Sequence, residues 1–212
     1  MLLFQLTNYV NGLMFALEVI FLEKQSEKPG IHTRLLHSAV QSEGLGATLP
    51  PIYQVSAFTH ETAEELERVF HHQAPGFAYT RIGNPTEAAF EGRMAALEGG
   101  IGAVACASGM AAISMALLNI LGSGDEIIAS SCLFGGTIDL FGDLEKLGIH
   151  TKFVVDMKPE AVAPLITEHT KAIFTEVIGN PKLNVVDVAA LARLAHSHGI
   201  PLLADSTTLW RT

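Results

Sequence analysis

Ser108-Gly109-Met110 has the residue types and the position that binding an anion requires. The tripeptide stands where an apolar run turns into a helical pattern, and the first backbone N–H groups of a helix have no partners within that helix. These groups and the positive end of the helix dipole attract phosphate, and Gly109 would let an anion approach the backbone closely. The alternative is an ordinary turn in which Ser108 only caps the helix.

Three further candidates follow apolar runs of the chain. Asp205 ends the run at 201–204, where a carboxylate can pair with the protonated nitrogen of a heteroaromatic ring or simply cap a turn. Phe134 can stack on such a ring or fill the core at a turn, and Asn180 follows a run that ends near Glu176. Because ligands of parallel sheets bind beyond the carboxyl ends of the strands, these residues can converge on one crevice.

Tyr79 and Arg81 offer a phenol and a guanidinium two residues apart. In an extended segment both side chains would point to the same side, and a guanidinium suits bidentate contact with a phosphate. A surface loop with an incidental arginine is the alternative. The helix that follows is expected to begin at Asn84 as its N-cap, with Pro85 in the first turn, and to end at Gly99-Gly100.

Hydrophobic patterning predicts the elements that must position these side chains. The strands are expected over 102–107, 126–130, 151–155, 172–177 and 201–204, and the helices between them over 108–121, 137–147, 159–168 and 187–198. This alternation implies right-handed crossovers and an α/β fold with a mostly parallel sheet that has helices on both faces. Ahead of this region the pattern predicts a loop-rich stretch over 31–60 and a helix over 62–72, which a capping box opens.

Composition excludes several classes of partner. The net charge is −9 and the 13 basic residues are scattered along the chain, so nucleic acid is not expected as a partner. The first 22 residues are strongly apolar, but Glu18 interrupts them and no basic residue precedes Lys24. We therefore expect no membrane segment or signal peptide, but a mis-assigned start or an arm that packs on a neighbouring subunit.

Cysteine and histidine residues do not predict a structural disulfide or a metal site. Cys106 and Cys132 lack a C-x-x-C spacing and are expected to be reduced thiols of a cytoplasmic protein. His71-His72 and the pair His196 and His198 lie on polar helix ends, where solvated side chains are expected in place of metal ligands.

Five segments, in this order, resemble the motifs of the Cys/Met-metabolism family of pyridoxal-phosphate (PLP) enzymes. They are Tyr79-Thr80-Arg81-Ile82-Gly83-Asn84-Pro85-Thr86, Ala107-Ser108-Gly109-Met110, Leu133-Phe134-Gly135-Gly136-Thr137, Asn180-Pro181 and Asp205-Ser206-Thr207. The resemblance covers residues 32–208 and implies a PLP-dependent transferase type I (aspartate-aminotransferase-like) large domain that is incomplete. The composition indicates an apolar arm and a polar break over 1–30, and the resemblance implies an N-terminal segment over 31–75 and a partial PLP-binding domain over 76–212.

The resemblance also implies a role for each candidate residue. Tyr79 and Arg81 would reach the PLP phosphate of a neighbouring subunit, and the backbone amides of Ser108, Gly109 and Met110 would bind the phosphate from the other side. Asn180 would contact the ring hydroxyl, Asp205 the ring nitrogen, and Thr207 would pack beside the ring. Phe134 stands where the family usually has a tyrosine that stacks on the ring, so any acid–base role of that phenol is in doubt here.

Within the family, the chain resembles the O-acetylhomoserine sulfhydrylases, which make homocysteine and acetate from O-acetyl-L-homoserine and sulfide. The cystathionine γ-synthase, cystathionine γ-lyase and methionine γ-lyase branches are alternatives, and the resemblance implies a homodimer or homotetramer. The family lysine that forms the Schiff base would follow Asp205, but no lysine follows Lys182 in these 212 residues. We therefore expect a truncated chain that is inactive by itself, with no catalytic residue of its own. A non-catalytic PLP- or partner-binding remnant and an unrelated nucleotide-binding α/β domain are the competing hypotheses.

Overall fold

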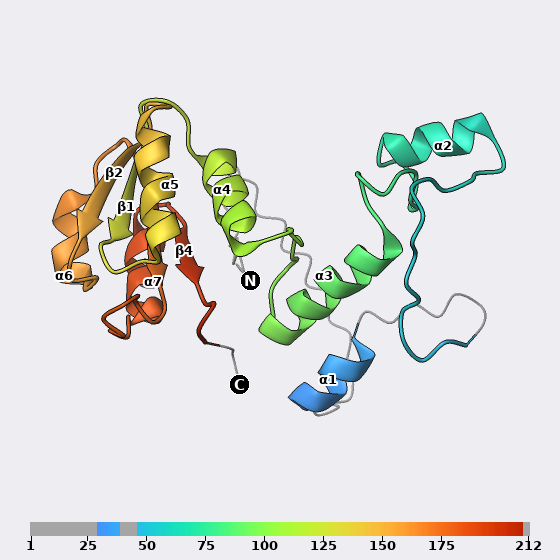
Figure 1. The fold of residues 1–212 in the computed structure, drawn as a ribbon, viewed down its shortest axis with the longest axis horizontal. Helices are drawn as coiled ribbons and strands as arrows, with labels where there is room; N and C mark the ends of the chain where they lie inside the picture. Colours follow the sequence, from blue (N-terminus) through green and yellow to red (C-terminus); the bar gives the residue numbers. More distant parts are fainter. Residues whose placement is uncertain (1–28, 39–45, 210–212) are drawn as a thin grey trace. The chain divides into compact units, whose positions relative to one another are not determined.

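Figure 1 shows the computed structural model, which describes residues 29–38 and 46–209. The described residues form two compact units, which divide between Ala105 and Cys106. The predicted apolar arm over 1–22 lies outside the described residues, and the predicted domain boundary at residue 76 stays a prediction. No helix in the part of the chain that the structure describes is long and apolar enough to cross a membrane.

The C-terminal unit is built on a four-stranded sheet in the order β2-β1-β3-β4, in which every pair of neighbours is parallel. The strands are β1 (Glu126–Ser130), β2 (His150–Val154), β3 (Thr170–Glu176) and β4 (Leu202–Asp205). The two central strands, β1 and β3, are buried along almost their whole length. Such near-continuous burial is typical of parallel strands that are covered on both faces.

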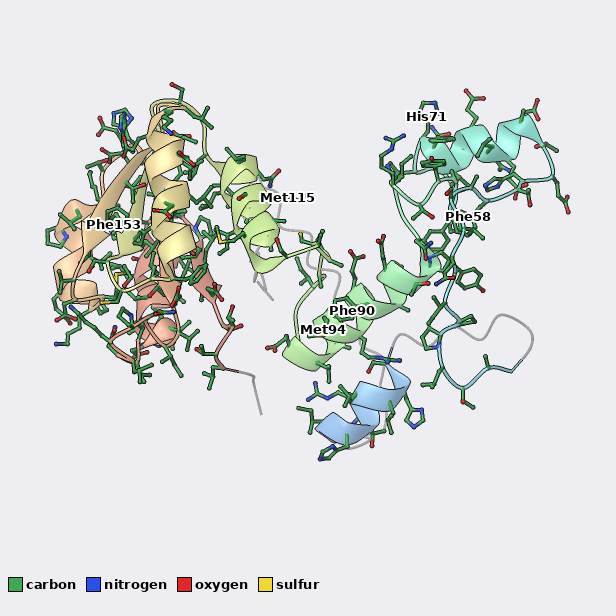
Figure 2. All side chains as sticks on the ribbon, viewed as in Figure 1. Phe58, His71, Phe90, Met94, Met115 and Phe153 are labelled. Atoms are coloured by element: carbon green, nitrogen blue, oxygen red, sulfur yellow. The ribbon has the colours of Figure 1, made fainter. Side chains whose placement is uncertain are left out.

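Helices cover both faces of this sheet, as the sequence predicts. On one face α4 (Gly109–Ile120) and α5 (Gly135–Glu145) enclose a core that includes Leu117, Phe141 and Phe174. On the other face α6 (Pro159–Val162) and α7 (Val188–Ser197) pack on the side chains that the same strands direct to that face. Phe141 is central to the first core, because two other rings pack edge-on against it. The ring centroid of Phe174 lies 5.4 Å from that of Phe141, and the centroid of Phe153, which Figure 2 labels, lies 5.9 Å away.

Helix ends in this unit are fixed by local side chains. The Ser108 hydroxyl accepts the backbone N–H of Ala111 at 3.1 Å at the start of α4, and Asp187 does the same for Ala190 at 2.9 Å at the start of α7. Gly199 follows α7 with a φ of 71°, which closes the helix in the left-handed conformation that glycine adopts readily. These short-range bonds explain why the sequence predicts α4 and α7 to within one residue at each end.

The N-terminal unit contains α1 (Ile31–His37), α2 (Ala63–Phe70) and α3 (Pro85–Glu98). Asn84 caps α3 as predicted, since its side chain accepts the Thr86 N–H at 2.8 Å, and Gly99 ends the helix with a φ of 66°. Thr62 likewise caps α2. The loop-rich prediction over 31–60 is wrong for α1, which Arg34 fastens to the end of α3 by donating to the carbonyl oxygen of Ala96 at 2.9 Å.

Two predicted elements differ from the structure. Residues 102–107 form no strand, because the run is rich in alanine and glycine, has a single β-branched residue and pairs with no strand among the described residues. Val104 is 73% exposed. The helix predicted over 159–168 is limited to α6 and the 3-10 turn η1 (Ala163–Leu165), since Pro164 cannot donate a backbone hydrogen bond to a continuing α-helix.

Replacing Phe174 with alanine tests this core. Phe174 is fully buried, so the Phe174→Ala variant is expected to lose about 3–5 kcal/mol of unfolding free energy through lost burial and a residual cavity. Urea unfolding followed by circular dichroism measures the loss. Leu147→Ala is the control, because Leu147 is 56% exposed in the same unit, and its cost is expected to stay below about 1 kcal/mol. Equal losses in the two variants would contradict the assignment of the core.

Candidate functional site

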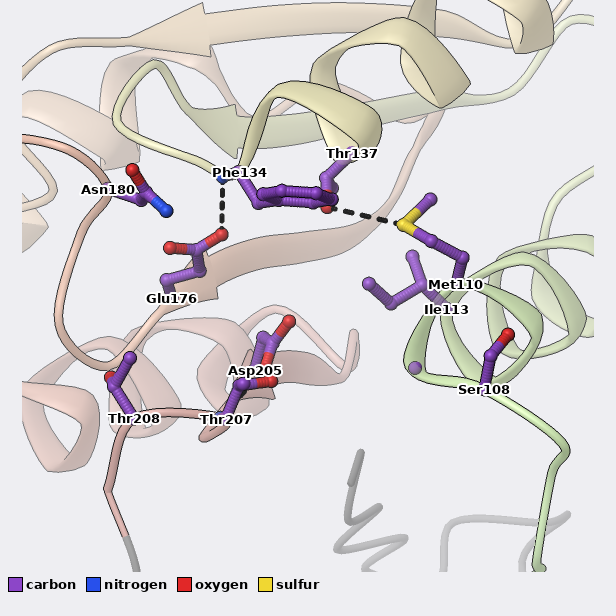
Figure 3. Close-up of a pocket in the computed structure, with 11 residues that line it drawn as sticks. Ser108, Met110, Ile113, Phe134, Thr137, Glu176, Asn180, Asp205, Thr207 and Thr208 are labelled. Atoms are coloured by element: carbon purple, nitrogen blue, oxygen red, sulfur yellow. Dashed lines mark hydrogen bonds between the residues drawn. The ribbon is translucent and has the colours of Figure 1, made fainter.

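A cavity of about 310 Å³ opens at the carboxyl ends of β3 and β4. Figure 3 shows the side chains around it, which come from the start of α4, the start of α5 and the ends of both strands. Its lining residues are Ser108, Gly109, Met110, Ile113, Phe134, Thr137, Glu176, Asn180, Asp205, Thr207 and Thr208. Seven of the nine residues predicted to bind a cofactor are among them; their binding role stays a prediction.

The start of α4 provides unpartnered N–H groups to this cavity. Ser108 uses its hydroxyl and its carbonyl oxygen for the N–H groups of Ala111 and Ala112, and the N–H groups of Gly109 and Met110 have no acceptor among the described residues. A Cβ placed on Gly109 would meet no protein atom within 4 Å. Neither packing nor a positive φ requires glycine there, so the open space above the helix end can receive an anion.

Phe134 is the residue before α5, and its ring lies in the cavity wall. Figure 3 shows the ring extending from the turn toward Met110. A Cβ on Gly136 would lie 2.7 Å from the Phe134 ring, so the glycine makes room for the ring to lie back over the first turn of α5. Half of Phe134 is exposed (52%), which leaves a ring surface on which an aromatic ligand can stack.

The two carboxylate oxygens of Asp205 differ in their hydrogen bonds. Its Oδ1 accepts the backbone N–H of Thr207 at 2.9 Å and the hydroxyl of the same residue. Its Oδ2 has no hydrogen-bond partner within the described residues. The residue is 9% exposed, and its second oxygen, which has no protein partner, can accept a hydrogen bond from a ligand in the cavity.

Glu176 is a cavity residue that the sequence did not reveal. It is the last residue of β3, stands opposite Asp205 of β4 in the register and is 7% exposed. Burial and the neighbouring Asp205 carboxylate raise the pKa of Glu176, while backbone N–H groups of Phe134 and Asn180 oppose that rise. Both carboxylates directly end an apolar strand, and this shared position is the signal by which Glu176 could have been found.

Ile113, Thr137 and Thr208 also line the cavity without having been predicted as site residues. Ile113 belongs to the core face of α4, and a sequence pattern does not separate such a residue from a cavity wall. The Thr137 hydroxyl contacts the Met110 sulfur at 3.9 Å (Figure 3), which joins the first turns of α4 and α5.

Tyr79 and Arg81 lie in the N-terminal unit and do not line this cavity. The segment between them is a turn and not extended, because the carbonyl oxygen of Tyr79 accepts the N–H groups of Ile82 and Gly83. Arg81 still lies on the same side as Tyr79, with its guanidinium carbon 5.4 Å from the centroid of the phenol ring. This cation–π contact keeps a phenol and a guanidinium together.

Cys106 and Cys132 are free thiols. In the described ranges no group of three or more histidine, cysteine or acidic side chains is arranged to hold a metal ion.

The cavity fits a flat aromatic ligand with an anionic group at one end and a protonated nitrogen at the other. Free N–H groups and a positive helix end lie at α4, while two carboxylates lie at the ends of β3 and β4. The Phe134 ring stands between these ends as a stacking surface (Figure 3). PLP has this distribution of charge, so the residues present fit it.

The raised pKa of Glu176 predicts a dependence of stability on pH. A raised pKa means that folding disfavours the ionised carboxyl, so stability is full at low pH and is lost as the pH rises through the folded-state pKa. The Glu176→Gln variant lacks this loss. Its unfolding free energy relative to wild type is therefore expected to increase between about pH 4 and about pH 8, measured by urea unfolding.

Glu126→Gln is the control with the opposite sign. The Lys152 ammonium, 2.6 Å from the Glu126 carboxylate, and then the Thr167 hydroxyl hold the pKa of Glu126 below its usual range. That carboxylate contributes stability above its unfolded-state pKa and loses it as the pH falls through the folded-state pKa. Glu126→Gln is therefore expected to be less stable than wild type near neutral pH, and the same pH trend in both variants would contradict these assignments.

Comparison with known proteins identifies the family of this chain. Residues 32–210 match the family model described as Cys/Met metabolism PLP-dependent enzyme. The chain is 40% identical over 183 residues to a homocysteine synthase of Schizosaccharomyces pombe, covering 85% of this chain and 43% of that protein. The chain thus spans less than half the length of this relative.

Two solved structures share the fold. One is a putative O-acetylhomoserine (thiol)-lyase from Campylobacter jejuni with N'-pyridoxyl-lysine-5'-monophosphate, at a TM-score of 0.79 and 32% identity over 84% of this chain and 44% of that one. The other is a cystathionine γ-lyase from Lactobacillus plantarum complexed with L-serine, at a TM-score of 0.76 and 35% identity over 84% and 45%. The expected α/β fold of the type I PLP enzymes is confirmed. The chain belongs to the Cys/Met metabolism family of PLP-dependent enzymes.

Proposed function

We propose that this chain is the part of a PLP-dependent sulfur amino-acid enzyme that binds the phosphate and ring of the cofactor. One observation carries the proposal: four segments far apart in sequence line one cavity with free N–H groups at one end and carboxylates at the other. The family to which the chain belongs uses PLP, which has a phosphate and a ring nitrogen at opposite ends.

Each end of the cavity has a separate task in this proposal. The N–H groups of Gly109 and Met110 bind the phosphate, and the Phe134 ring stacks on the ring of the cofactor. The Oδ2 atom of Asp205 accepts a hydrogen bond from the protonated ring nitrogen, and Thr207 keeps the carboxylate in place through Oδ1. When bound, PLP supplies an electron sink for carbanions, and a protonated ring nitrogen strengthens it.

The reaction we propose is that of the O-acetylhomoserine sulfhydrylases: O-acetyl-L-homoserine and sulfide give homocysteine and acetate. Similarity to a homocysteine synthase and to an O-acetylhomoserine (thiol)-lyase supports it. Similarity to a cystathionine γ-lyase keeps the cystathionine γ-synthase, γ-lyase and methionine γ-lyase branches as the alternative. The cavity residues bind the cofactor and not the acceptor, so they favour no branch over another.

A complete site is proposed to need a second subunit. Tyr79 and Arg81 form a phenol–guanidinium pair in the N-terminal unit, and Arg81 has the fork of donors that suits a phosphate. In a homodimer or homotetramer this pair is proposed to bind the phosphate held by the neighbouring subunit, as the family resemblance implies.

The competing proposal is a binding protein without turnover. No lysine lines the cavity among the described residues, and the last lysine of the sequence, Lys182, lines a different cavity, together with Asp156 and Asn184. The 212 residues therefore offer no amine to the cavity for attachment of the cofactor or for moving protons between substrate carbons. A non-catalytic PLP-binding remnant would have the same residues.

Gly109→Ala separates binding from folding. The new methyl group meets no protein atom within 4 Å, so the melting temperature is expected to stay equal or rise slightly, because alanine favours the helix. The methyl group fills the space above the N–H groups, so the affinity for PLP measured by calorimetry is expected to fall at least about tenfold. Gly142→Ala in α5, where a Cβ also meets nothing, is the control and should bind PLP as wild type does. Unchanged PLP affinity in Gly109→Ala would argue against the phosphate site.

The 212-residue polypeptide by itself is expected to bind PLP without catalysing the reaction, since it has no lysine after Lys182. Borohydride treatment with PLP, followed by peptide mass analysis, should find no cofactor on a lysine in the cavity. Homocysteine formation from O-acetylhomoserine and sulfide should not exceed that of a heat-treated sample. Turnover above this background would refute the proposal for the chain alone, and failure to bind PLP would refute the cofactor site.

A further inference from the structure

Glu176 holds two parts of the cavity wall that come from different loops. Its Oε1 accepts the backbone N–H of Phe134 at 2.6 Å, and the backbone N–H of Asn180 lies close enough to the same carboxyl group to lower its pKa. Phe134 follows β1 in the chain and Asn180 follows β3. One side chain at the end of β3 therefore binds the backbone of the Phe134 turn, as Figure 3 shows, and faces the backbone of the Asn180 loop.

Few charged residues line the cavity beside Glu176. Asp205 of β4 is the only other charged residue that lines the cavity in the described part of the chain. The start of α4 contributes Ser108, Met110 and Ile113, and the start of α5 contributes Phe134 and Thr137, all of them uncharged. Without the Glu176 oxygens, the partly buried backbone N–H group of Phe134 would lose its acceptor, which is costly.

These contacts depend more on the length of the Glu176 side chain than on its charge. The acceptor must extend from the last residue of β3 to N–H groups on two loops, and a glutamine oxygen has the same reach as a carboxylate oxygen. An aspartate keeps the charge but is one methylene shorter, so it cannot span the 2.6 Å contact to Phe134 without movement of the turn. The turn at Phe134 tolerates little movement, because the ring lies close over Gly136 in the first turn of α5.

We propose that Glu176 is a positioning residue, which places the Phe134 ring and the Asn180 side chain for contact with the aromatic ring of a bound pyridoxal-type ligand. The inference rests on the proposed function, because it takes the cavity to be the ring site. It adds a residue that makes no predicted contact with the cofactor and acts through two residues that do.

Calorimetric titration of the full chain with pyridoxine 5'-phosphate and, separately, with inorganic phosphate tests the proposal. Pyridoxine 5'-phosphate lacks an aldehyde, so only non-covalent contacts are measured. Glu176→Ala and Glu176→Asp are expected to lose about tenfold in affinity for pyridoxine 5'-phosphate, and Glu176→Gln to stay within about threefold of wild type. Affinity for inorganic phosphate is expected to stay within about twofold in all three variants, since the start of α4 is untouched.

Hydrogen exchange provides the second measurement and needs no ligand. Peptides that contain the Phe134 and Asn180 amides should exchange faster in Glu176→Ala and Glu176→Asp than in wild type, and at the wild-type rate in Glu176→Gln. Glu126→Ala is the matched control, because Glu126 is a partly buried carboxylate at the start of β1, bonded to Lys152 at the other end of the sheet. The Glu126→Ala variant should be less stable than wild type, with unchanged affinity for pyridoxine 5'-phosphate and unchanged exchange of the Phe134 and Asn180 amides.

The outcomes separate the two proposals. If wild type binds pyridoxine 5'-phosphate and Glu176→Asp binds it equally well, the positioning role is wrong and the proposed function stands. Equal losses for ring and phosphate ligands, or a Glu176→Gln variant as weak as Glu176→Ala, would also overturn the positioning role. If wild type binds no pyridoxine 5'-phosphate, the proposed function fails and this inference fails with it.

Discussion

Parallel pairing of β3 with β4 is the constraint on which the site depends. Because parallel strands end at the same edge, the register that pairs Ile173 with Leu202 also places Glu176 beside Asp205. The buried apolar residues of β3 hold this register, since a shift by one residue would turn its inward side chains to the opposite face. Two carboxylates are thus held together by a core that has no chemistry of its own.

The opposite end of the cavity depends on a different constraint, the capping of α4. Ser108 satisfies the Ala111 N–H with its side chain and that of Ala112 with its carbonyl oxygen, which leaves the amides of Gly109 and Met110 directed away from the helix and free of protein acceptors. Leu117 and Ile113 anchor the same helix in the core against the sheet. The anion-binding end and the carboxylate end of the cavity are therefore each anchored to the packed core, and the charge pattern of the cavity is built into the fold.

The two compact units divide the predicted site between them. The phenol and guanidinium of Tyr79 and Arg81 are held together by a local turn and a cation–π contact, independently of the sheet. The cavity residues are held by the sheet and its helices. Under the proposed function, the cavity residues bind the cofactor of their own subunit, and the Tyr79–Arg81 pair binds the phosphate held by a neighbouring subunit.

The sequence by itself determined the local features of this protein. Strong signals such as the caps Ser108 and Asn84 and the buried runs of β1 and β3 predict the elements, their alternation and the parallel sheet, because each depends on residues close in the chain. Seven cavity residues were predictable for the same reason: four follow or end a strand, and three stand at the capped start of α4. The apolar run over 102–107 and the helix α1 were misjudged, since a partner strand and a distant carbonyl acceptor decide them.

Only the tertiary structure decided what those residues do to one another. That Glu176 shares the cavity with Asp205 depends on the order β3-β4 in the sheet, and that it accepts the Phe134 N–H depends on a contact between residues 42 positions apart. The need for glycine at position 136 depends on where the Phe134 ring lies. Hydrogen-bond partners, burial and the direction of a pKa shift are properties of the space around a group, and that space is formed by segments that are remote in the sequence.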